Sequence, residues 1–489
     1  MTKAIEGLKP ERVWHYFAEI ANVPRCSKHE ERIREYILKT AKAMGLTTRV
    51  DDVGNVVVRK PASAGRGTAP GIALQGHLDM VCEKNKDTVH DFSKDPIVLV
   101  RKGEWMMANG TTLGADNGIA VAAILAVLED TTLTHGPIEA LFTIDEETGL
   151  TGAGGLANDM LESRTLLNLD SEEEYAVYVG CSGGRDTTGT WNAAFEPAPA
   201  KTVAGQLTVT GLKGGHSGLE IDKGRGNALK LLNRALLALD PLGARVASVQ
   251  GGDKRNAIPR EAEALLWIPA AKFDEAVQAV SAFEAVARAE LSTVEPGLVI
   301  SLAPQKGARR GSVIRKAQMK KIMQTISALP HGVTKMSADI PGLVETSTNV
   351  ASVRTDRAKK RLVLATSQRS SVASEIEEIC DTVQSILSLG GATVTGSDGY
   401  PGWKPNLDSA ILKVAKAVHT ELFGKEPAIK AIHAGLECGI IGEKMPGMDM
   451  VSFGPTLEGV HSPDERLHIA SVERFYRYLV AILAAVASR

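Results

Sequence analysis

Cysteine is scarce in this chain and nowhere has the paired spacing of a thiolate metal site. The five cysteines are Cys26, Cys82, Cys181, Cys380 and Cys438, and no two of them form a CxxC motif. An odd and scattered set argues against a disulfide framework and against a thiolate zinc site. We therefore expect reduced, mostly buried thiols. Any bound metal must then be held by histidine and carboxylate side chains.

The chain also lacks an excess of charge of one sign and a long apolar run. Its 56 Lys and Arg residues nearly balance 58 Asp and Glu residues, which leaves a formal net charge of −2. Such a chain has no overall field that attracts nucleic acid or an anionic membrane, so we expect a small-molecule partner. No stretch approaches the roughly 20 apolar residues that span a bilayer. The N-terminal segment has no apolar core of a secretory signal, which predicts a cytoplasmic protein.

At 489 residues the chain is too long for one hydrophobic core, and its pattern of elements changes twice. The first part alternates helices with short, continuously apolar strands, which is typical of a buried, mostly parallel α/β sheet. From about Arg185 the pattern indicates two consecutive α+β lobes with antiparallel sheets. After a turn-rich segment that begins at Gly396, the α/β pattern returns. We predict an α/β domain formed by 1–184 and 397–489, with an α+β domain inserted at 185–396.

Four predicted strands lead to a histidine or a carboxylate. Three of them, Gly71–Gln75, Pro137–Ile144 and Thr165–Leu169, run almost directly into such residues, and Met448–Phe453 runs into a loop that carries one. Ligands of α/β sheets bind at the carboxyl ends of the strands, so these side chains should gather there. Taken singly, each has a structural explanation, such as a helix cap for Asp116. With Asp116 the candidates are His77, Asp79, Asp145, Glu146, Glu147, Asp170 and His461.

Carboxylates that are buried together repel one another and lose their hydration. A pair of divalent cations removes that penalty, which predicts a two-metal site. Asp116 can bridge ions roughly 3.5–4 Å apart, the separation used by two-metal hydrolases. Residues two apart on an extended segment face the same side, so Asp79 can accept the free N–H of His77 and orient its ring. The adjacent side chains of Glu146 and Glu147 diverge, so that one can bind metal while the other acts as a base.

These residues lie in motifs that resemble those of the cocatalytic zinc peptidases, which include aminoacylase, peptidase T and the glutamate carboxypeptidases. Within that superfamily the chain is most similar to the branch of the aminoacyl-histidine (Xaa-His or β-alanyl-histidine) dipeptidases. The resemblance extends from about Val23 to His461. The motifs that carry it are GHLDM, TLGADNG, DEETG, NLDSEE, GGHSG, IHAGLECG and GVHSPDE.

The resemblance implies an α/β catalytic domain with a mostly parallel central sheet and an inserted α+β lid of two lobes. It implies two divalent ions per subunit, expected to be Zn²⁺, although Co²⁺ or Mn²⁺ also suits such ligands. Glu146 would be the general base for a water between the metals, and Asp79 would be the partner of His77. Asp116 would bridge the ions, with His77 and Asp170 completing one site and Glu147 and His461 the other.

The resemblance also assigns substrate recognition and dimerisation to the inserted domain. His216 would help to stabilise the oxyanion, either in its own subunit or across a homodimer. Arg369, whose planar fork suits a carboxylate, and Asn256 would contact a dipeptide. His433 and Glu437 match the family pattern without an assignable role. The implied reaction is hydrolysis of dipeptides, Xaa-His dipeptides such as β-alanyl-histidine (carnosine) among them.

Two alternatives stay open on the sequence. A tripeptidase, carboxypeptidase or N-acyl amino acid deacylase of the same superfamily would keep the metal ligands and differ in the inserted domain and substrate pocket. A metal-storage or scaffold protein would need neither Glu146 nor Asp79, so the presence of both argues against it.

Overall fold

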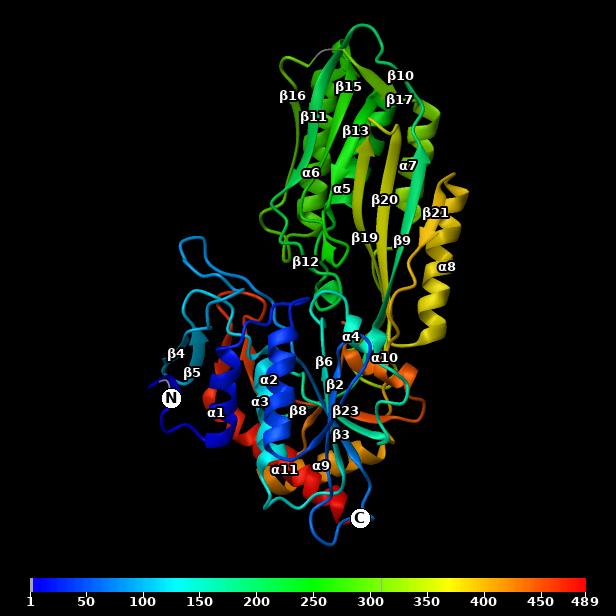
Figure 1. Ribbon diagram of the computed structural model, residues 1–489. Coiled ribbons are helices and arrows are strands. Elements are labelled where there is room, and N and C mark those ends of the chain that lie inside the picture. The colour runs from blue at the N-terminus through cyan, green and yellow to red at the C-terminus, as the bar shows by residue number, and fades with distance from the viewer. Residues whose placement is uncertain (1–2, 309) are drawn as a thin grey trace. The chain divides into compact units, whose positions relative to one another are not determined.

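The computed structural model describes residues 3–308 and 310–489, which divide into two compact units. Unit 1 contains the chain up to Cys181 together with Trp403–Ala431 and Leu436–Arg489. Unit 2 contains Ser182–Gly402 and Ile432–Gly435. The course of the chain through each unit can be followed in Figure 1. Unit 2 is thus an insertion into the sequence of unit 1.

Unit 1 is built on an eight-stranded sheet with the order β1-β2-β6-β3-β7-β23-β8-β22. The central neighbours β6–β3, β3–β7 and β7–β23 are parallel. The pairs β1–β2, β2–β6 and β23–β8 are antiparallel. The predicted α/β domain with a parallel central sheet is therefore confirmed, and antiparallel strands extend the sheet on both sides. The strands are β1 (Thr47–Val50), β2 (Val56–Lys60), β3 (Ile72–His77), β6 (Ile138–Thr143), β7 (Thr165–Asn168), β8 (Ala176–Cys181), β22 (Ala428–Ile432) and β23 (Asp449–Ser452).

The central strands β3 and β6 are buried along their length because they are covered on both faces. Every residue of β3 and of β6 is buried, as the continuous apolar runs predict. Helix α3 (Ala115–Glu129) is apolar on all sides and packs against α1 and β3. Its first residues, Asp116 and Asn117, have non-helical backbone angles. The other helices of unit 1 are α1 (Glu11–Ala21), α2 (Glu31–Ala43), α4 (Thr151–Gly155), α9 (Ala410–Phe423), α10 (Glu437–Lys444) and α11 (Ile469–Ala487).

A second, antiparallel sheet of unit 1 has the order β24-β25-β5-β4. Its strands are β4 (Leu99–Lys102), β5 (Trp105–Ala108), β24 (Leu457–Glu458) and β25 (Arg466–His468). The turn between β24 and β25 carries His461, whose backbone lies in the left-handed region at φ 62°. This small sheet therefore supports the loop that follows β23.

Unit 2 contains one antiparallel sheet of nine strands with the order β16-β11-β15-β13-β19-β20-β9-β21, and β18 also pairs with β19. We expected two lobes with a sheet each, and the two sheets are joined because Gln250 and Gly251 of β13 pair with β19. The strands are β9 (Gly183–Asn192), β11 (Thr202–Thr210), β13 (Arg245–Gly251), β15 (Ala262–Pro269), β16 (Val299–Pro304), β18 (Gly332–Met336), β19 (Val344–Asp356), β20 (Arg361–Ser370) and β21 (Thr393–Gly396).

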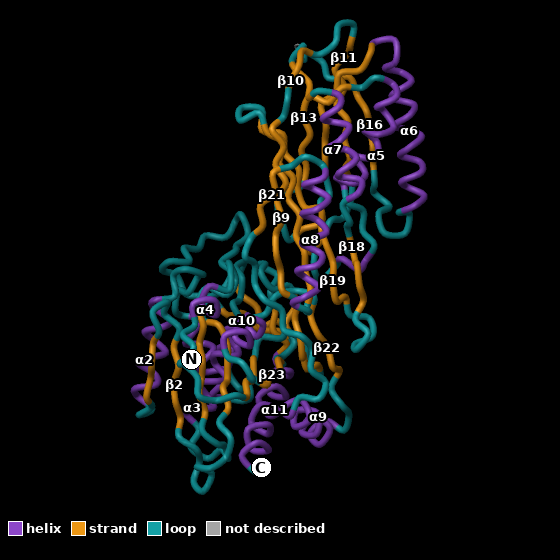
Figure 2. Tube along the Cα trace, turned by 90° about the vertical axis from the view of Figure 1, so that its right-hand side faces the viewer, coloured by secondary structure: helices purple, strands orange, loops and turns teal. Residues whose placement is uncertain are grey.

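Helices α5 to α8 lie along the large sheet of unit 2, as Figure 2 shows. They are α5 (Ala228–Leu239), α6 (Phe273–Glu290), α7 (Lys316–Ala328) and α8 (Ala373–Leu389). Their apolar residues and those of the sheet form one continuous core. The side chain of Asn227 caps α5 by accepting from the backbone N–H groups of Leu229 and Lys230. Two short pairs complete the unit: β10 (Phe195–Pro197) with β17 (Ser312–Ile314), and β12 (Gly215–His216) with β14 (Ala257–Ile258).

Cys26 and Cys82 form a disulfide bond in unit 1, so the expectation of reduced thiols is wrong for these two residues. Cys26 follows α1 and Cys82 follows β3, 56 positions later. A backbone bridge between Cys26 and Met80 brings the two segments together. Spacing alone does not reveal such a pairing. The three other cysteines are free and buried, as expected: Cys181, Cys380 and Cys438.

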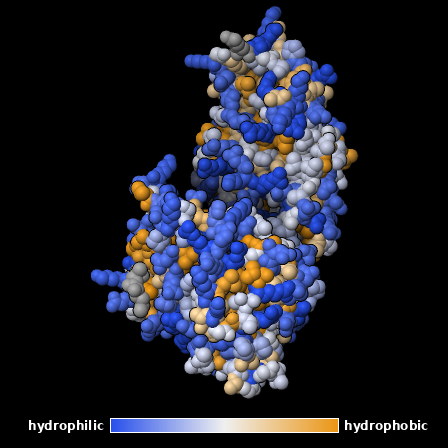
Figure 3. All heavy atoms as spheres, in the orientation of Figure 1, coloured by the Kyte–Doolittle hydropathy of each residue, from blue (hydrophilic) through white to orange (hydrophobic). Residues whose placement is uncertain are grey.

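Hydrophilic residues cover most of the face drawn in Figure 3, with apolar residues scattered among them. The most exposed large apolar side chains include Val89 and Leu389, which belong to different units. Isolated apolar side chains of this kind are normal on a protein surface. Among the described residues, no helix combines the length and apolar character needed to cross a membrane.

Strand β11 offers a matched test of the core of unit 2. Leu207 is 0% exposed, whereas Val203 on the same strand is 37% exposed. Leu207→Ala should lower the free energy of unfolding of unit 2 by about 2–5 kcal/mol, because it leaves a cavity in a close-packed core. Val203→Ala should change it by less than about 0.5 kcal/mol. Denaturant unfolding followed by hydrogen exchange in β11 measures both, and equal losses would contradict the assigned core.

Candidate metal centre

The candidate ligands of unit 1 lie at or beyond the carboxyl ends of neighbouring parallel strands, of which β3, β6 and β23 are labelled in Figure 1. Strand β3 ends at His77, and β6 and β7 end two to four residues before their carboxylates. The chain that follows β23 carries His461 in the turn between β24 and β25. In the strand order β6-β3-β7-β23 the edge carries Glu146 and Glu147, then His77 and Asp79, then Asp170, and finally His461.

Asp116 lies between the two histidines and offers each a different oxygen. Its Oδ1 is 3.1 Å from Nε2 of His77, and its Oδ2 is 3.1 Å from Nε2 of His461. Asp170 Oδ1 lies 3.3 Å from the same nitrogen of His77. Glu147 Oε2 lies 2.9 Å from the same nitrogen of His461. The residues thus form two ligand triads that share one carboxylate.

The donor atoms of each triad are close enough to converge on one cation. Potential ligand atoms of His77, Asp116 and Asp170 lie within 4.8 Å of one another, as do those of Asp116, Glu147 and His461. The buried Oε1 of Glu147 has no hydrogen-bond partner among the described residues, and Oδ1 of Asp170 has only the ring of His77 nearby. Buried carboxylate oxygens without donors are expected to face a cation. Two histidines and three carboxylates, with no thiolate among them, fit a pair of divalent ions.

The pKa values of these groups show that the pocket favours positive charge. Burial raises the pKa of Asp170 to about 6, although His77 opposes this shift. Hydrogen bonds to Asp116 and Glu147 raise the pKa of His461 to about 11. Burial lowers the pKa of His77, but Asp170 and Asp116 outweigh it and raise the pKa well above its usual value. The two imidazoles thus lie where the neighbouring carboxylates favour positive charge.

Asp79 orients both His77 and the two glutamates. Its Oδ1 lies 3.3 Å from Nδ1 of His77 and accepts from the backbone N–H of Glu146 at 3.0 Å. Its Oδ2 accepts from the N–H of Glu147 at 3.2 Å and from the hydroxyl of Ser27 at 2.8 Å. Burial opposes ionisation of Asp79, but the His77 ring more than compensates and lowers its pKa to about 2. An ionised Asp79 therefore fixes the ring of His77 and the turn that carries both glutamates.

Glu146 lies beside the triads. A carboxylate oxygen of Glu146 lies within 4.8 Å of ligand atoms of His77 and Glu147. Burial raises its pKa well above the usual value; His77 lowers it, while Asp170 and Glu147 raise it further. A carboxylate with a raised pKa is suited to accept a proton near neutral pH.

His216 in unit 2 lies on the short strand β12. Its Nδ1 accepts from the backbone N–H groups of Gly218 at 3.2 Å and Leu219 at 3.0 Å. In a neutral ring that accepts at Nδ1, the proton is on Nε2. Burial, assisted by the charge of Arg369, lowers the pKa of His216 to about 4. His216 is therefore a neutral hydrogen-bond donor at neutral pH.

Arg369 and Asn256 lie in the same unit as His216. Arg369, on β20, is 6% exposed, and its Nη1 donates to the hydroxyl of Tyr400 at 3.0 Å. Its buried Nε has no hydrogen-bond partner among the described residues. Asn256 has an exposed side chain, and its backbone carbonyl accepts from the N–H of Ser217 at 2.8 Å. Backbone pairing thus brings Asn256 next to the segment that carries His216. The guanidinium of Arg369 keeps its Nε–H available as a donor.

His433, left without a role on the sequence, belongs to this group of residues in unit 2. Its Nε2 lies 2.7 Å from the hydroxyl of Ser347, and its buried Nδ1 has no hydrogen-bond partner among the described residues. Burial lowers its pKa to about 3, and the charge of Arg369 contributes. Unit 2 therefore gathers a guanidinium and two neutral imidazoles.

Glu437, also left without a role, lies buried in unit 1. Its Oε2 accepts from Nε2 of Gln75 and from the hydroxyl of Thr143, both at 2.6 Å. Burial raises its pKa to about 7. Asn168 donates in turn to Gln75. The polar residues of β3, β6 and β7 are thus linked beneath the candidate metal centre.

Glu465 was not singled out from the sequence, although it ends the motif that contains His461. It is 2% exposed, and its carboxylate accepts four successive backbone N–H groups. These are Leu113 at 2.7 Å, Gly114 at 2.9 Å, Ala115 at 2.8 Å and Asp116 at 3.3 Å. Glu465 therefore holds the loop that carries the shared carboxylate.

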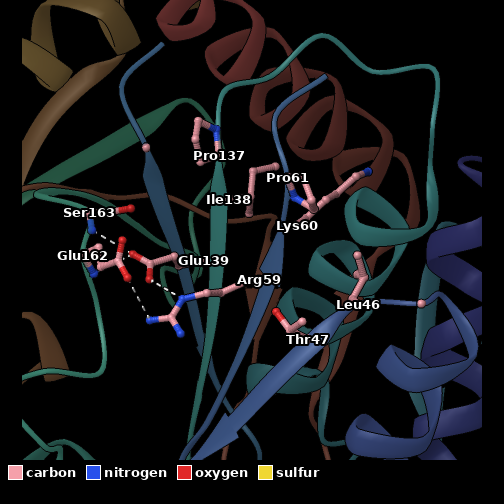
Figure 4. Close-up of a pocket in the computed structure, with 12 residues that line it drawn as sticks. Leu46, Thr47, Arg59, Lys60, Pro61, Pro137, Ile138, Glu139, Glu162 and Ser163 are labelled. Carbon is pink, nitrogen blue, oxygen red and sulfur yellow. Dashed lines mark hydrogen bonds and ion pairs between the residues drawn. The ribbon is translucent and has the colours of Figure 1, made fainter. Parts of the chain in front are cut away.

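A cavity of about 420 Å³ lies elsewhere in unit 1, at the start of β6 (Figure 4). Its acidic residues are paired with Arg59, which lies 3.1 Å from Glu139 and 3.8 Å from Glu162. The start of β6 is the end opposite to the one followed by Glu146 and Glu147. This cavity therefore does not belong to the candidate metal centre.

Three comparisons with known proteins agree. A sequence profile of peptidase family M20/M25/M40 matches residues 73–485. The cytosol non-specific dipeptidase of Escherichia coli (strain K12) is 43% identical over 490 residues, which cover 99% of each chain. The crystal structure of aminoacylhistidine dipeptidase from Vibrio alginolyticus has 42% identity and a TM-score of 0.89, covering 99% of this chain and 98% of that one.

A tripeptidase from Staphylococcus aureus, with 17% identity and a TM-score of 0.58, is similar in fold alone. The resemblance drawn from the motifs is confirmed by the profile and by both dipeptidases. Because the profile spans most of the chain and these two relatives span nearly all of it, this chain belongs to peptidase family M20/M25/M40.

Proposed function

We propose that this chain is a two-metal dipeptidase that hydrolyses Xaa-His dipeptides, β-alanyl-histidine among them. The observation that carries the proposal is the position of Asp116, with one carboxylate oxygen toward each histidine triad. As a member of its family the chain is a hydrolase that acts on peptide bonds. Its two similar relatives, a non-specific dipeptidase and an aminoacylhistidine dipeptidase, support dipeptides as the substrate class.

In this proposal His77, Asp170 and Asp116 hold one ion, and Glu147, His461 and Asp116 hold the other. Zn²⁺ suits the donor set best, while Co²⁺ and Mn²⁺ are also compatible with imidazole and carboxylate ligands. When bound, two such ions would supply a water of lowered pKa and polarise the scissile carbonyl. Asp79 would hold the ring of His77 in the orientation that presents Nε2, since it lies beside Nδ1.

The protein side chains would move the proton and hold the substrate. Glu146 would accept the proton of the attacking water and return it to the leaving amine, a role that its raised pKa supports. His216 would donate from Nε2 to the developing oxyanion, which its neutral state supports. Arg369 would bind the dipeptide carboxylate, and Asn256 would assist as a polar contact.

We further propose that unit 1 is the catalytic domain and that unit 2 serves substrate recognition and dimerisation. A homodimer is the proposed assembly. The proposed location is the cytoplasm, supported by the name of the Escherichia coli relative. The proposed partners are small dipeptides, with neither nucleic acid nor membrane among them.

A substrate panel tests the proposed activity. The zinc-loaded protein should cleave dipeptides, including β-alanyl-histidine, at least about tenfold faster than tripeptides, acetylated amino acids or longer peptides. The same protein after chelation should be inactive and should recover with Zn²⁺, Co²⁺ or Mn²⁺, because the nucleophile depends on metal. Release of histidine measured by chromatography provides the rates. Preferred cleavage of tripeptides or acylated amino acids would identify a different enzyme of the family.

Substitution of each of the two adjacent glutamates by glutamine should have a different effect. Glu146→Gln should reduce kcat by about 10²-fold or more with two ions still bound, because it removes the proton acceptor. Glu147→Gln should reduce metal content, because it removes a ligand oxygen. Inductively coupled plasma analysis beside the kinetics distinguishes the two. The reverse pattern would exchange the roles of these residues.

The two residues of unit 2 should affect different kinetic constants. Arg369→Ala should mainly raise KM, because a carboxylate is held in the ground state and the transition state alike. His216→Ala should mainly lower kcat, because the oxyanion exists only after attack. Mixing inactive His216→Ala and Glu146→Gln subunits would restore activity only if His216 acts across the dimer. Equal effects of both substitutions on KM would exclude the oxyanion role.

A further inference from the structure

The proposed mechanism makes no use of the segment that follows α1, yet this segment lies against the metal-ligand loops of unit 1. The backbone N–H of Met80 donates to the carbonyl of Arg25 at 3.1 Å, and Cys26 forms a bridge with Met80. The disulfide joins Cys26 to Cys82, two residues beyond that bridge. A covalent bond thus fixes the segment beside the chain that leaves β3.

Arg25 connects two of the candidate metal-site loops through their carbonyl groups. It is 3% exposed, and its Nη1 donates to the carbonyls of Leu78 at 3.0 Å and Asp79 at 2.9 Å. Its Nη2 donates to the carbonyl of Gly114, two residues before Asp116. One planar guanidinium therefore spans the loop of Asp79 and the loop of Asp116.

The sequence leaves space for this guanidinium. A Cβ atom at Gly114 would lie 2.6 Å from Nη2 of Arg25, and one at Gly118 would lie equally close. Gly114 also has a φ of 69°, which favours glycine. The carboxylate of Glu465 accepts the backbone N–H groups of the four residues from Leu113 to Asp116, in the loop that contains Gly114. A buried cation and a buried carboxylate thus hold the Gly114 loop from its carbonyl and amide sides.

Ser27 adds a direct contact from the same segment. Its hydroxyl donates to Oδ2 of Asp79 at 2.8 Å. Asp79 in turn contacts His77 and the backbone of Glu146 and Glu147. The residues on either side of Cys26 therefore reach the loops of the candidate ligands through Asp79 and through Gly114.

We propose that Arg25 and Ser27 are positioning residues for the metal ligands, and that the Cys26–Cys82 disulfide is a redox-sensitive brace that keeps them in place. This inference rests on the metal centre of the proposed function. Reduction of the bond frees the segment, loosens the Asp79 and Asp116 loops and weakens metal binding. Contacts that hold a metal ligand in its orientation are worth about 10–100-fold in metal affinity.

The redox step is a thiol–disulfide exchange with a dithiol. Two electrons and two protons pass from the dithiol to the protein, so that Cys26 and Cys82 become thiols and the dithiol becomes a cyclic disulfide. Both cysteines are partly exposed, which leaves the bond accessible. Disulfides of cytosolic proteins are usually catalytic or redox-sensing rather than permanent. The bond would thus report the redox state of the compartment to the metal centre.

Cobalt binding tests the brace independently of activity. Metal-free protein is prepared oxidised, or reduced and then freed of reductant under argon, and is titrated with Co²⁺ by visible absorption. Reduction should raise the Co²⁺ dissociation constant by about tenfold or more and change the ligand-field spectrum. By linkage, saturating Co²⁺ should favour the disulfide by the same factor in a dithiol redox titration. A Cys26→Ser, Cys82→Ser double variant should bind Co²⁺ as weakly as the reduced protein, and the reductant should not change its affinity.

Arginine substitutions test the guanidinium separately. Arg25→Lys keeps the charge but cannot span three carbonyls, so it should weaken Co²⁺ binding about tenfold and alter the spectrum. Arg49→Lys is the matched control, because Arg49 also donates to a backbone carbonyl of unit 1, that of Asp159, but is exposed. It should bind Co²⁺ like the wild type.

The outcomes separate this inference from the proposed function. If the oxidised wild type binds no Co²⁺, the metal centre is refuted and the brace with it. If two ions bind, and if neither reduction nor Arg25→Lys alters affinity or spectrum, only the brace is refuted. A fall in thermal stability without a change in Co²⁺ binding would likewise assign a purely structural role. Reduction needs no substitution, so the test stands even if an Arg25 variant does not fold.

Discussion

Mutual repulsion among buried carboxylates is the constraint around which unit 1 is organised. Asp116, Glu147 and Asp170 approach one another where little water can solvate them, and only positive charge makes that arrangement stable. In the structure His77 and His461 face Asp116 from two sides and have raised pKa values. A pair of divalent ions would meet the same requirement with two charges each. The demand for positive charge and the proposed chemistry thus arise from one cause.

Such a site requires precise support, and the surrounding backbone supplies it. Asp79 accepts N–H groups from the glutamate turn, and Glu465 accepts four N–H groups from the Asp116 loop. Each of these two carboxylates binds main-chain N–H groups of a loop that carries a metal ligand. It therefore positions the ligand and leaves the ligand side chain free for the metal. Strands β3 and β6 beneath are fully buried. A two-ion site needs ligands that are carried on packed elements and held in place by hydrogen bonds.

Much of this organisation could be read from the sequence. Continuous apolar runs that end in His77 or Asp170 indicate parallel strands and the edge where ligands gather, and the family motifs add Asp116 and His461. The antiparallel outer strands and the joined sheet of unit 2 could not be read, because pairing partners leave no local pattern. The roles of Arg25 and Glu465 could not be predicted because both bind backbone groups, which every residue type provides. The disulfide could not be predicted because its cysteines are distant in the chain and unremarkable in spacing.

The pairing of β7 with β23 has a consequence for synthesis of the protein. These strands are neighbours in the parallel sheet, yet the whole of unit 2 is encoded between them. Asp116 and His461 are 345 positions apart, which at about 5–20 residues per second corresponds to roughly 17–70 s of translation. Until β23 and then His461 are made, the nascent chain exposes an open edge of β7 and carboxylates that lack their last histidine. Unit 2, by contrast, has all of its sequence available before β23 exists, so the inserted domain can fold on the ribosome before unit 1 has its own C-terminal part.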